Sequence, residues 1–313
     1  MPEGALDPAK FQDPFVTAKG ETRAFVGLTG LKTLWFNTGS LCNITCQNCY
    51  MESGPKKDDL AYISAAQVST YLDELKNLDQ PTIEIGFTGG EPFMNADLPA
   101  MLGDVLGRGF EALVLTNAMK PLWHMRDALL DVKARFGTDR LTLRVSVDHF
   151  TQAQHEQERG PKSWDPMAQG VAWLVDQGFA VDVAGRTLWG EDEAHSRAGY
   201  QALFDGWGLK LDAQDASSLV LFPEMNAAED VPEITTACWG LLGVRPDAQM
   251  CATSRMVVLR KGDSEPRVTP CTLLPYDPAF DLGETLFEAQ GDVQLNHPHC
   301  AKFCVLGGAS CSV

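Results

Sequence analysis

Three cysteines near the start of the chain have a spacing suited to redox chemistry. Cys42, Cys46 and Cys49 lie within one short polar segment, and the aromatic residue Tyr50 follows directly. Three thiolates can bind one face of a [4Fe–4S] cluster but leave one of its four irons without a protein ligand. An iron with an open position can bind a small molecule and act on it, as a catalytic zinc does. The alternatives are a zinc site, which normally takes four ligands, and three thiols with a purely structural role.

The remaining six cysteines lie near the other end of the chain, and none occurs between Tyr50 and Ala237. They are Cys238, Cys251, Cys271, Cys300, Cys304 and Cys311. The first residues show no basic region followed by an apolar one, so we expect a cytoplasmic protein, in which disulfides are rare. The two groups therefore predict two metal-binding regions. For the second group, a structural zinc held by four cysteines is the alternative.

The charge of the chain limits the partners that it can bind. Its formal net charge is −17 at pH 7. A surface this acidic repels a phosphate backbone, so we do not expect the protein to bind nucleic acid. The sequence also lacks an apolar run of about eighteen residues, so we expect no membrane-spanning segment.

Short β-like runs alternate with longer helical patterns through the middle of the chain, and these elements must position the cysteines. The predicted strands are 32–37, 82–88, 112–116, 141–147, 180–185 and 219–222. The predicted helices are 65–77, 98–108, 122–136, 166–177 and 191–207. This alternation predicts an α/β fold with a parallel sheet, either a partial barrel or an open doubly wound sheet. Both architectures bind ligands at the carboxyl ends of their strands.

The last part of the chain differs from the middle. Residues 226–236 are polar and contain a proline, which predicts a boundary. We therefore divide the chain into an N-terminal surface segment at 1–30, an α/β domain at 31–225 and a cysteine-rich domain at 226–313. Within the last domain, two β-like runs around a Lys-Gly-Asp turn at 261–263 predict a hairpin. This domain is small and rich in loops, so a bound metal would stabilise it.

A glycine-rich motif, Gly89–Pro92 (GGEP), ends the second predicted strand. The cysteine motif after the first strand and this motif after the second together resemble the signature of the radical S-adenosylmethionine (SAM) superfamily. The resemblance implies a partial (βα)6 TIM-like barrel with a small cysteine-rich C-terminal extension. It also implies that Cys42, Cys46 and Cys49 hold a [4Fe–4S] cluster whose open iron binds SAM.

The resemblance further implies which residues contact SAM. The backbone of Gly89, Gly90 and Glu91 would hold the methionyl amino group, because glycines let backbone approach a ligand closely. Glu91 would balance the charge of that group, and Tyr50 would lie against the adenine; the alternative for Glu91 is an acid in the first turn of a helix. Similar strand-end positions touch SAM or substrate in the family; here they are Asn117, Ser146, Asp148 and Arg186. Each of these could instead be an ordinary cap or turn residue.

The C-terminal cysteines resemble the SPASM and twitch extensions of this superfamily. In those extensions, cysteines that flank a hairpin combine with later cysteines to bind a further [4Fe–4S] cluster. Six cysteines are too few for two complete clusters, so we expect one auxiliary cluster. Its expected ligands are Cys251, Cys271, Cys300 and Cys304, with Cys311 as the chief rival. We expect Cys238 to be a buried thiol and His297 and His299 to be turn residues.

The activity that the resemblance implies is reductive cleavage of SAM to methionine and a 5′-deoxyadenosyl radical, which takes hydrogen from an unactivated carbon. An electron donor such as flavodoxin or ferredoxin would reduce the cluster. We expect a small-molecule substrate, because no peptide-recognition domain precedes the barrel. The alternatives are a peptide or protein maturase and, from another class, a non-catalytic zinc or iron–sulfur binding module.

Overall fold

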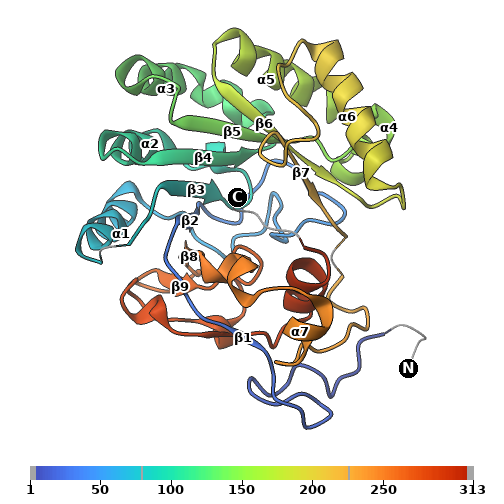
Figure 1. Cartoon of the computed structure of the whole chain (residues 1–313). Coiled ribbons are helices and arrows are strands. Elements are labelled where there is room, and N and C mark those ends of the chain that lie inside the picture. The colour runs from blue at the N-terminus through green and yellow to red at the C-terminus, as the bar shows by residue number, and fades with distance from the viewer. Residues whose placement is uncertain (1–4, 79, 225, 309–313) are drawn as a thin grey trace.

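A parallel sheet dominates the computed structural model of the protein, which describes residues 5–78, 80–224 and 226–308. Six consecutive parallel strands form it: β2 (Thr33–Asn37), β3 (Glu84–Thr88), β4 (Glu111–Thr116), β5 (Leu141–Ser146), β6 (Ala180–Arg186) and β7 (Leu219–Phe222). Each strand pairs with the next one in the chain, from β2 to β7. This is the predicted partial (βα)6 barrel, seen in the upper half of Figure 1.

Helices connect the strands and cover one face of the sheet (Figure 1). They are α1 (Ala65–Asn77), α2 (Leu98–Gly107), α3 (Lys120–Phe136), α4 (Gln152–Arg159), α5 (Trp164–Asp176) and α6 (Glu193–Trp207). Local signals fix their ends: Ser64 and Gln67 form a capping box at the start of α1, and Gly208 ends α6 in the left-handed conformation. Apolar side chains such as Leu72 and Met101 join the strand residues that face the helices in one large core.

Five of these helices match predicted ranges, whereas α4 was not predicted. Apolar periodicity reveals a helix only if the helix buries an apolar face. The residues of α4 read QAQHEQER, and its two buried side chains are His155 and Glu158. This helix packs a polar face inward, so it has no apolar repeat to detect.

The C-terminal part continues the same sheet. Strand β8 (Ser254–Val258) pairs in parallel with β2 and antiparallel with β9 (Arg267–Thr269), which extends the sheet to eight strands. The predicted hairpin is therefore present, and it docks on the free edge of the barrel. The short helix α7 (Cys238–Leu242), several 3-10 turns and a π-helical turn at Cys300–Val305 complete this part.

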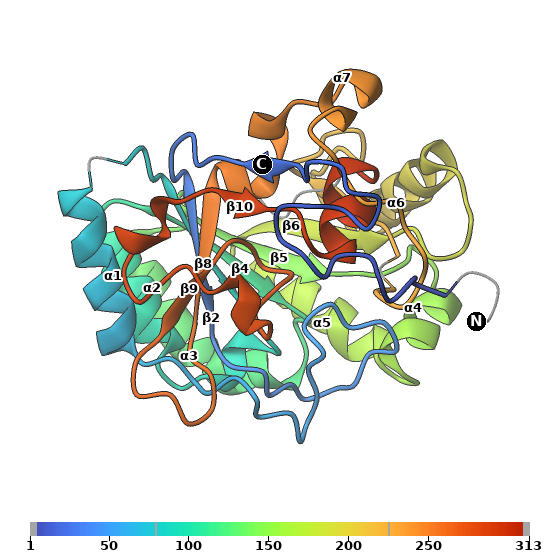
Figure 2. The same cartoon turned by 90° about the horizontal axis from the view of Figure 1, so that it is seen from below.

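The N-terminal segment lies across this C-terminal part, as Figure 2 shows from below. Strand β1 (Phe25–Val26) pairs with β10 (Val293–Gln294). Arg23 is buried and forms an ion pair with Glu233 over 2.6 Å. These contacts join the two ends of the described chain into one unit. No helix in the described ranges is long and apolar enough to span a membrane.

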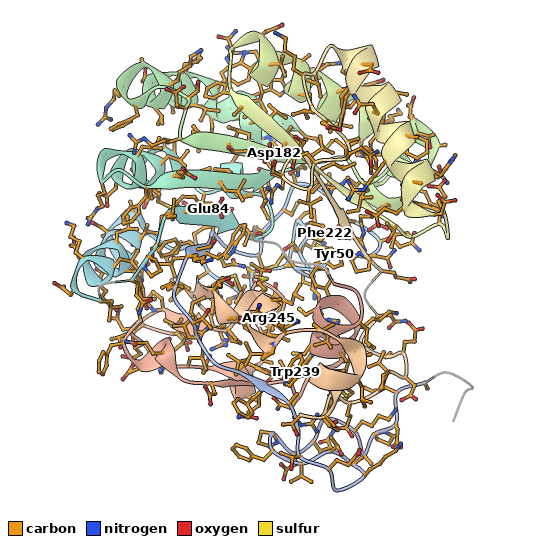
Figure 3. All side chains as sticks on the ribbon, viewed as in Figure 1. Tyr50, Glu84, Asp182, Phe222, Trp239 and Arg245 are labelled. Carbon is orange, nitrogen blue, oxygen red and sulfur yellow. The ribbon has the colours of Figure 1, made fainter. Side chains whose placement is uncertain are left out.

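The second face of the sheet lines the interior of the partial barrel. Trp35 on β2 is fully buried there and belongs to the same apolar cluster as Met256 on β8. Charged residues occupy a neighbouring layer: Arg144 on β5 contacts Asp182 on β6 over 3.3 Å, and Glu84 lies on β3 (Figure 3). Above this filled layer, the carboxyl ends of the strands surround the candidate site.

Candidate active site

Cys42, Cys46 and Cys49 lie in the loop after β2, where one cavity brings them together with the ends of β3 to β7. Burial raises the pKa of the Cys42 thiol to about 12 and that of the Cys46 thiol to about 11. Without a metal these two thiols hold their protons, so loading iron must displace them. The cavity is lined by Cys42, Ile44, Cys46, Cys49, Tyr50, Met51, Ser53, Thr88, Gly89, Gly90, Leu115, Thr116, Asn117, Ser146, Asp148, Arg159, Ala184, Arg186 and Phe222.

The cysteine loop rests directly on the glycine-rich motif. The amide of Gly90 donates to Gly39 O over 2.8 Å, and the amide of Glu91 donates to Leu41 O over 3.1 Å. A Cβ atom at Gly90 would lie 2.1 Å from Leu41 O, so no side chain fits there. From the sequence, we expect Gly90 to let the backbone approach a ligand closely. The structure shows a further role for Gly90, which is to let the cysteine loop pack against the end of β3, and its contact with SAM stays a prediction.

Glu91 also has a role that differs from the expected one. Its carboxylate accepts hydrogen bonds from the Phe93 amide, the Thr116 hydroxyl and the Asn117 amide, over 2.8 to 3.1 Å. The side chain is buried, which raises its pKa, and it does not line the cavity. Glu91 thus caps the 3-10 turn Pro92–Met94 and links the end of β3 to the end of β4. This role resembles the alternative given for Glu91, an acid in the first turn of a helix. Its contact with SAM stays a prediction.

The other expected SAM contacts do line the cavity: Tyr50, Gly89, Gly90, Asn117, Ser146 and Arg186. Asn117 donates from its side-chain amide to Asn43 over 2.9 Å, which fixes it beside the cysteine loop. Arg186 is buried and donates from Nη1 to Asn48 O over 2.6 Å. Its Nε and Nη2 atoms are also buried and have no hydrogen-bond partner within the described residues. These two buried donors can therefore bind an acceptor group of a ligand in the cavity.

Helix α4 contributes two residues that the sequence analysis did not identify. Glu158 accepts from the Asn48 amide over 2.7 Å and lies 3.4 Å from Arg186 Nη1. Arg159 lines the cavity and forms a bidentate ion pair with Asp148, over 2.7 and 3.1 Å. Burial opposes the charge of Arg159, but Asp148 and the nearby Cys46 sulfur outweigh it and raise its pKa. The last turn of α4 thus supports the cysteine loop and places a cation beside it.

Tyr50 connects this site to the C-terminal part of the molecule. Its hydroxyl donates to Pro223 O, and the guanidinium of Arg186 lies 4.2 Å from its ring centroid. The ring meets Phe222 edge-on, with 5.8 Å between centroids, and the two residues lie together at the centre of Figure 3. Phe303 of the C-terminal π-helical turn also meets Tyr50 edge-on, at 6.0 Å. The residue after Cys49 therefore packs against the turn that carries Cys300 and Cys304.

A second cavity lies in the C-terminal part, and all four expected auxiliary ligands line it. They are Cys251, Cys271, Cys300 and Cys304, among the apolar residues Met250, Pro270, Leu274, Val293 and Leu295 and the polar residue Gln249. Burial raises the pKa of Cys251 to about 11 and that of Cys300 to about 12. Cys238, His297 and His299 do not line this cavity, and Cys311 lies outside the described residues.

The eight described cysteines form no disulfide. In the described ranges, no three His, Cys, Asp or Glu side chains converge as ligands of a single metal ion. A [4Fe–4S] cluster makes a different demand, because each thiolate binds a separate iron and the sulfurs stand apart.

Comparison with known proteins identifies the family of this chain. The sequence model of the radical SAM superfamily matches residues 36–193. The antilisterial bacteriocin subtilosin biosynthesis protein AlbA of Bacillus subtilis is 30% identical over 144 residues, which are 46% of this chain and 30% of AlbA. The mycofactocin maturase MftC of Mycobacterium tuberculosis is 26% identical over 139 residues, or 44% of this chain and 33% of MftC.

Another relative has a different kind of name. The AdoMet-dependent heme synthase of Nitratidesulfovibrio vulgaris is 25% identical over 187 residues, or 58% of this chain and 46% of the synthase. The chain therefore matches less than half the length of each of these three relatives.

Solved structures share the fold. The structure of Streptococcus suis SuiB bound to the precursor peptide SuiA aligns with a TM-score of 0.57 at 11% identity. The alignment covers 90% of this chain and 67% of SuiB. An alignment this long extends beyond the barrel into the C-terminal part.

Proposed function

This chain belongs to the radical SAM superfamily, and we propose that it removes a hydrogen atom from a carbon of a peptide substrate. It is an enzyme whose cofactors are a [4Fe–4S] cluster and SAM. When bound, they supply the one-electron cleavage of SAM that yields methionine and a 5′-deoxyadenosyl radical. The observation that carries the proposal is a single cavity lined by three thiols, the backbone of the glycine motif and Arg186.

The residues of the cavity fit both cofactors. Cys42, Cys46 and Cys49 are the cysteines that line it, so a cluster held there keeps one iron available for another ligand. Arg186 offers two buried donors that have no partner among the described residues, which suits the carboxylate of SAM. We propose that these four residues hold the cluster and the methionyl end of SAM.

Other residues of the chain shape the site around these groups. Asn117, Ser146 and the Gly89–Gly90 backbone provide polar atoms at the strand ends, and Tyr50 provides an aromatic surface. Glu91, outside the cavity lining, holds the ends of β3 and β4 together through its hydrogen bonds. Ile44, Leu115 and Phe222 form an apolar wall that limits access of water.

We propose that the second cavity holds one auxiliary [4Fe–4S] cluster on Cys251, Cys271, Cys300 and Cys304. All four thiols line the same largely apolar space. Four protein ligands leave no iron open, which favours an electron-transfer role over direct substrate binding. A reduced flavodoxin or ferredoxin is the electron donor that we propose for the enzyme.

The comparisons support a peptide substrate over the small molecule that the sequence analysis preferred. Two of the relatives are named for bacteriocin biosynthesis and for maturation. SuiB, which shares the fold, has been solved with its precursor peptide. The heme synthase favours a second candidate, a small-molecule substrate, because its match covers a larger share of this chain.

The test is anaerobic reconstitution of the full chain with iron and sulfide, followed by SAM and dithionite. We expect formation of 5′-deoxyadenosine. Addition of short peptides encoded beside the gene, deuterated in turn at each residue, should transfer deuterium into 5′-deoxyadenosine. Transfer from a deuterated porphyrin in place of the peptide would select the second candidate. Absence of 5′-deoxyadenosine from a fully loaded protein would contradict the proposed reaction.

A further inference from the structure

Arg255 is a buried cation that the proposed reaction does not use. It lies on β8, next in space to the auxiliary cavity, and its side chain is fully shielded from solvent. Its partners are all backbone carbonyl oxygens: Nε donates to Ala289 over 2.8 Å, Nη1 to Cys251 over 2.6 Å and to Ser254 over 2.8 Å, and Nη2 to Gly291 over 3.1 Å. None of these groups carries a negative charge.

A guanidinium in this position has a large desolvation cost. Removing a cation from water costs several kcal/mol, and neutral carbonyls recover only part of it. Burial accordingly lowers the pKa of Arg255, and the neighbours that act against this shift are the Cys251 and Cys271 sulfurs. Arg23 provides a contrast within the same part of the molecule. It is equally buried but has the carboxylate of Glu233 at 2.6 Å.

The hydrogen bond from Nη1 to Cys251 O places the guanidinium against the backbone of a proposed cluster ligand. Cys271 follows β9, the strand that pairs with β8. Two of the four thiols of the cavity therefore belong to segments adjoining Arg255. Once these thiols are ionised by iron, they supply the negative charge that the other neighbours of Arg255 lack.

We propose that Arg255 is the buried counter-charge of the auxiliary cluster and raises its reduction potential. The inference rests on the auxiliary cluster of the proposed function. A cluster held by four thiolates is negatively charged and gains one more negative charge on reduction. A fixed cation nearby stabilises the reduced form more than the oxidised form, and the mainly apolar lining of the cavity screens this interaction little. Arg255 thus makes this cluster a better electron acceptor.

The test measures the potential of the auxiliary cluster in isolation. The Cys42→Ala/Cys46→Ala/Cys49→Ala chain is reconstituted anaerobically with iron and sulfide, so that the remaining cluster gives the only iron–sulfur signal. Its midpoint potential is read by titration with redox dyes, followed by electron paramagnetic resonance of the reduced state. Arg255→Lys keeps the charge but loses most hydrogen bonds, whereas Arg255→Gln loses the charge.

Arg260→Gln is the matched control. It removes the same charge just beyond the opposite end of β8, where Arg260 is paired with Asp281 over 2.9 Å. We expect Arg255→Gln to shift the midpoint to a lower potential, Arg255→Lys to remain near the parent and Arg260→Gln to match it. Loss of iron in Arg255→Gln alone, with iron kept in Arg255→Lys, also supports the counter-charge, because Arg255→Lys retains the positive charge although it loses most of the hydrogen bonds.

An unchanged midpoint in Arg255→Gln with full iron would overturn the inference while leaving the auxiliary cluster intact. Equal shifts, or equal loss of iron, in Arg255→Lys and Arg255→Gln would also overturn it and assign Arg255 a hydrogen-bonding role only. If the parent triple variant binds no iron at all, the auxiliary cluster itself is refuted, and the inference with it.

Discussion

The three cysteines of the barrel lie in one loop, whereas the four cysteines of the C-terminal cavity come from three separate segments. The surroundings differ as well. The barrel cavity contains Asn117, Asp148, Arg159 and Arg186, and two donors of Arg186 have no described partner. The C-terminal cavity is lined mainly by apolar side chains, and the adjoining cation Arg255 already donates to four carbonyls.

This contrast indicates that the two sites are suited to different ligands. A site with spare donors and fewer thiols can bind and exchange a polar ligand. A site with more thiols and apolar walls can hold a group permanently and exclude ligands from it. The Tyr50–Phe303 contact joins the two sites through one aromatic pair. Variants that damage one site and spare the other test this division.

The largest expected effect is loss of the barrel site. Replacing Cys42, Cys46 and Cys49 together by Ala should abolish formation of 5′-deoxyadenosine. The iron content should fall from about eight to about four atoms per chain, since each [4Fe–4S] cluster contributes four. Iron analysis and chromatography of the SAM products measure both outcomes. A triple variant that still forms 5′-deoxyadenosine would refute the barrel site, and zinc in place of the remaining iron would refute the auxiliary cluster.

Gly90→Ala should damage the barrel site through packing alone. The new Cβ would lie 2.1 Å from Leu41 O and 2.5 Å from Leu41 C, which are backbone atoms of the cysteine loop. We expect a loss of about 1–3 kcal/mol in the free energy of unfolding, as for other overpacked sites. We also expect a lower iron content in the barrel site. The auxiliary iron should remain.

Gly103→Ala is the matched control for this variant. Its Cβ would have its nearest neighbour, a Phe136 ring carbon, at 3.7 Å, which is an ordinary contact. Because Gly103 is inside α2, the added methyl group should be neutral or stabilise the protein by up to about 1 kcal/mol. Equal effects of both variants on iron content would contradict the fit of the loop against Gly90.

The two sites also differ in how far the sequence alone could predict them. The barrel site was predictable because its signals are local: three cysteines in one loop and a glycine motif at the next strand end. Arg159 and Glu158 could not be predicted, because they lie on a helix whose inward face is polar. The packing of Leu41 against Gly90 was not predicted either, since the sequence does not show which backbone lies against this glycine.

The C-terminal site depends on contacts between distant segments. The four ligands were chosen by resemblance to a family, and their spacing alone would not have brought them together. The hairpin was predicted from local patterns, but its parallel pairing with β2 joins residues more than two hundred positions apart. Local patterns contain no information about such a pairing, which forms because β2 has a free edge.

A smaller effect concerns pH and the helix that supports the barrel site. His155 is fully buried on α4, and burial, assisted by Arg159, lowers its pKa to about 4. The unfolded chain, with a histidine pKa of about 6.5, binds the proton more readily. Stability from this residue is therefore complete above about pH 6.5 and is lost as the pH falls toward 4, by on the order of 2–3 kcal/mol.

His155→Leu should remove that part of the pH dependence. Urea denaturation at several pH values between 4 and 7 gives the free energy of unfolding at each pH. The dependence of this free energy on pH should be weaker in the variant than in the parent. The exposed His124, replaced in the same way, is the control. If the parent and His155→Leu lose stability in parallel on acidification, the protonation of His155 does not govern this region.

The smallest expected effect belongs to Cys238, which lies near the auxiliary ligands in sequence but not in their cavity. Its sulfur contacts the Thr235 amide and hydroxyl, each at 3.4 Å, and its side chain is partly exposed, so the expected burial of this thiol was wrong. Cys238→Ala should therefore change the free energy of unfolding by less than about 1 kcal/mol and keep about eight irons per chain. Cys300→Ala removes a buried thiol that we propose as a ligand, so it should lose the auxiliary iron. A Cys238→Ala protein that lacks auxiliary iron while Cys300→Ala retains it would show that the cluster uses other ligands, and Cys311→Ala would then identify the rival.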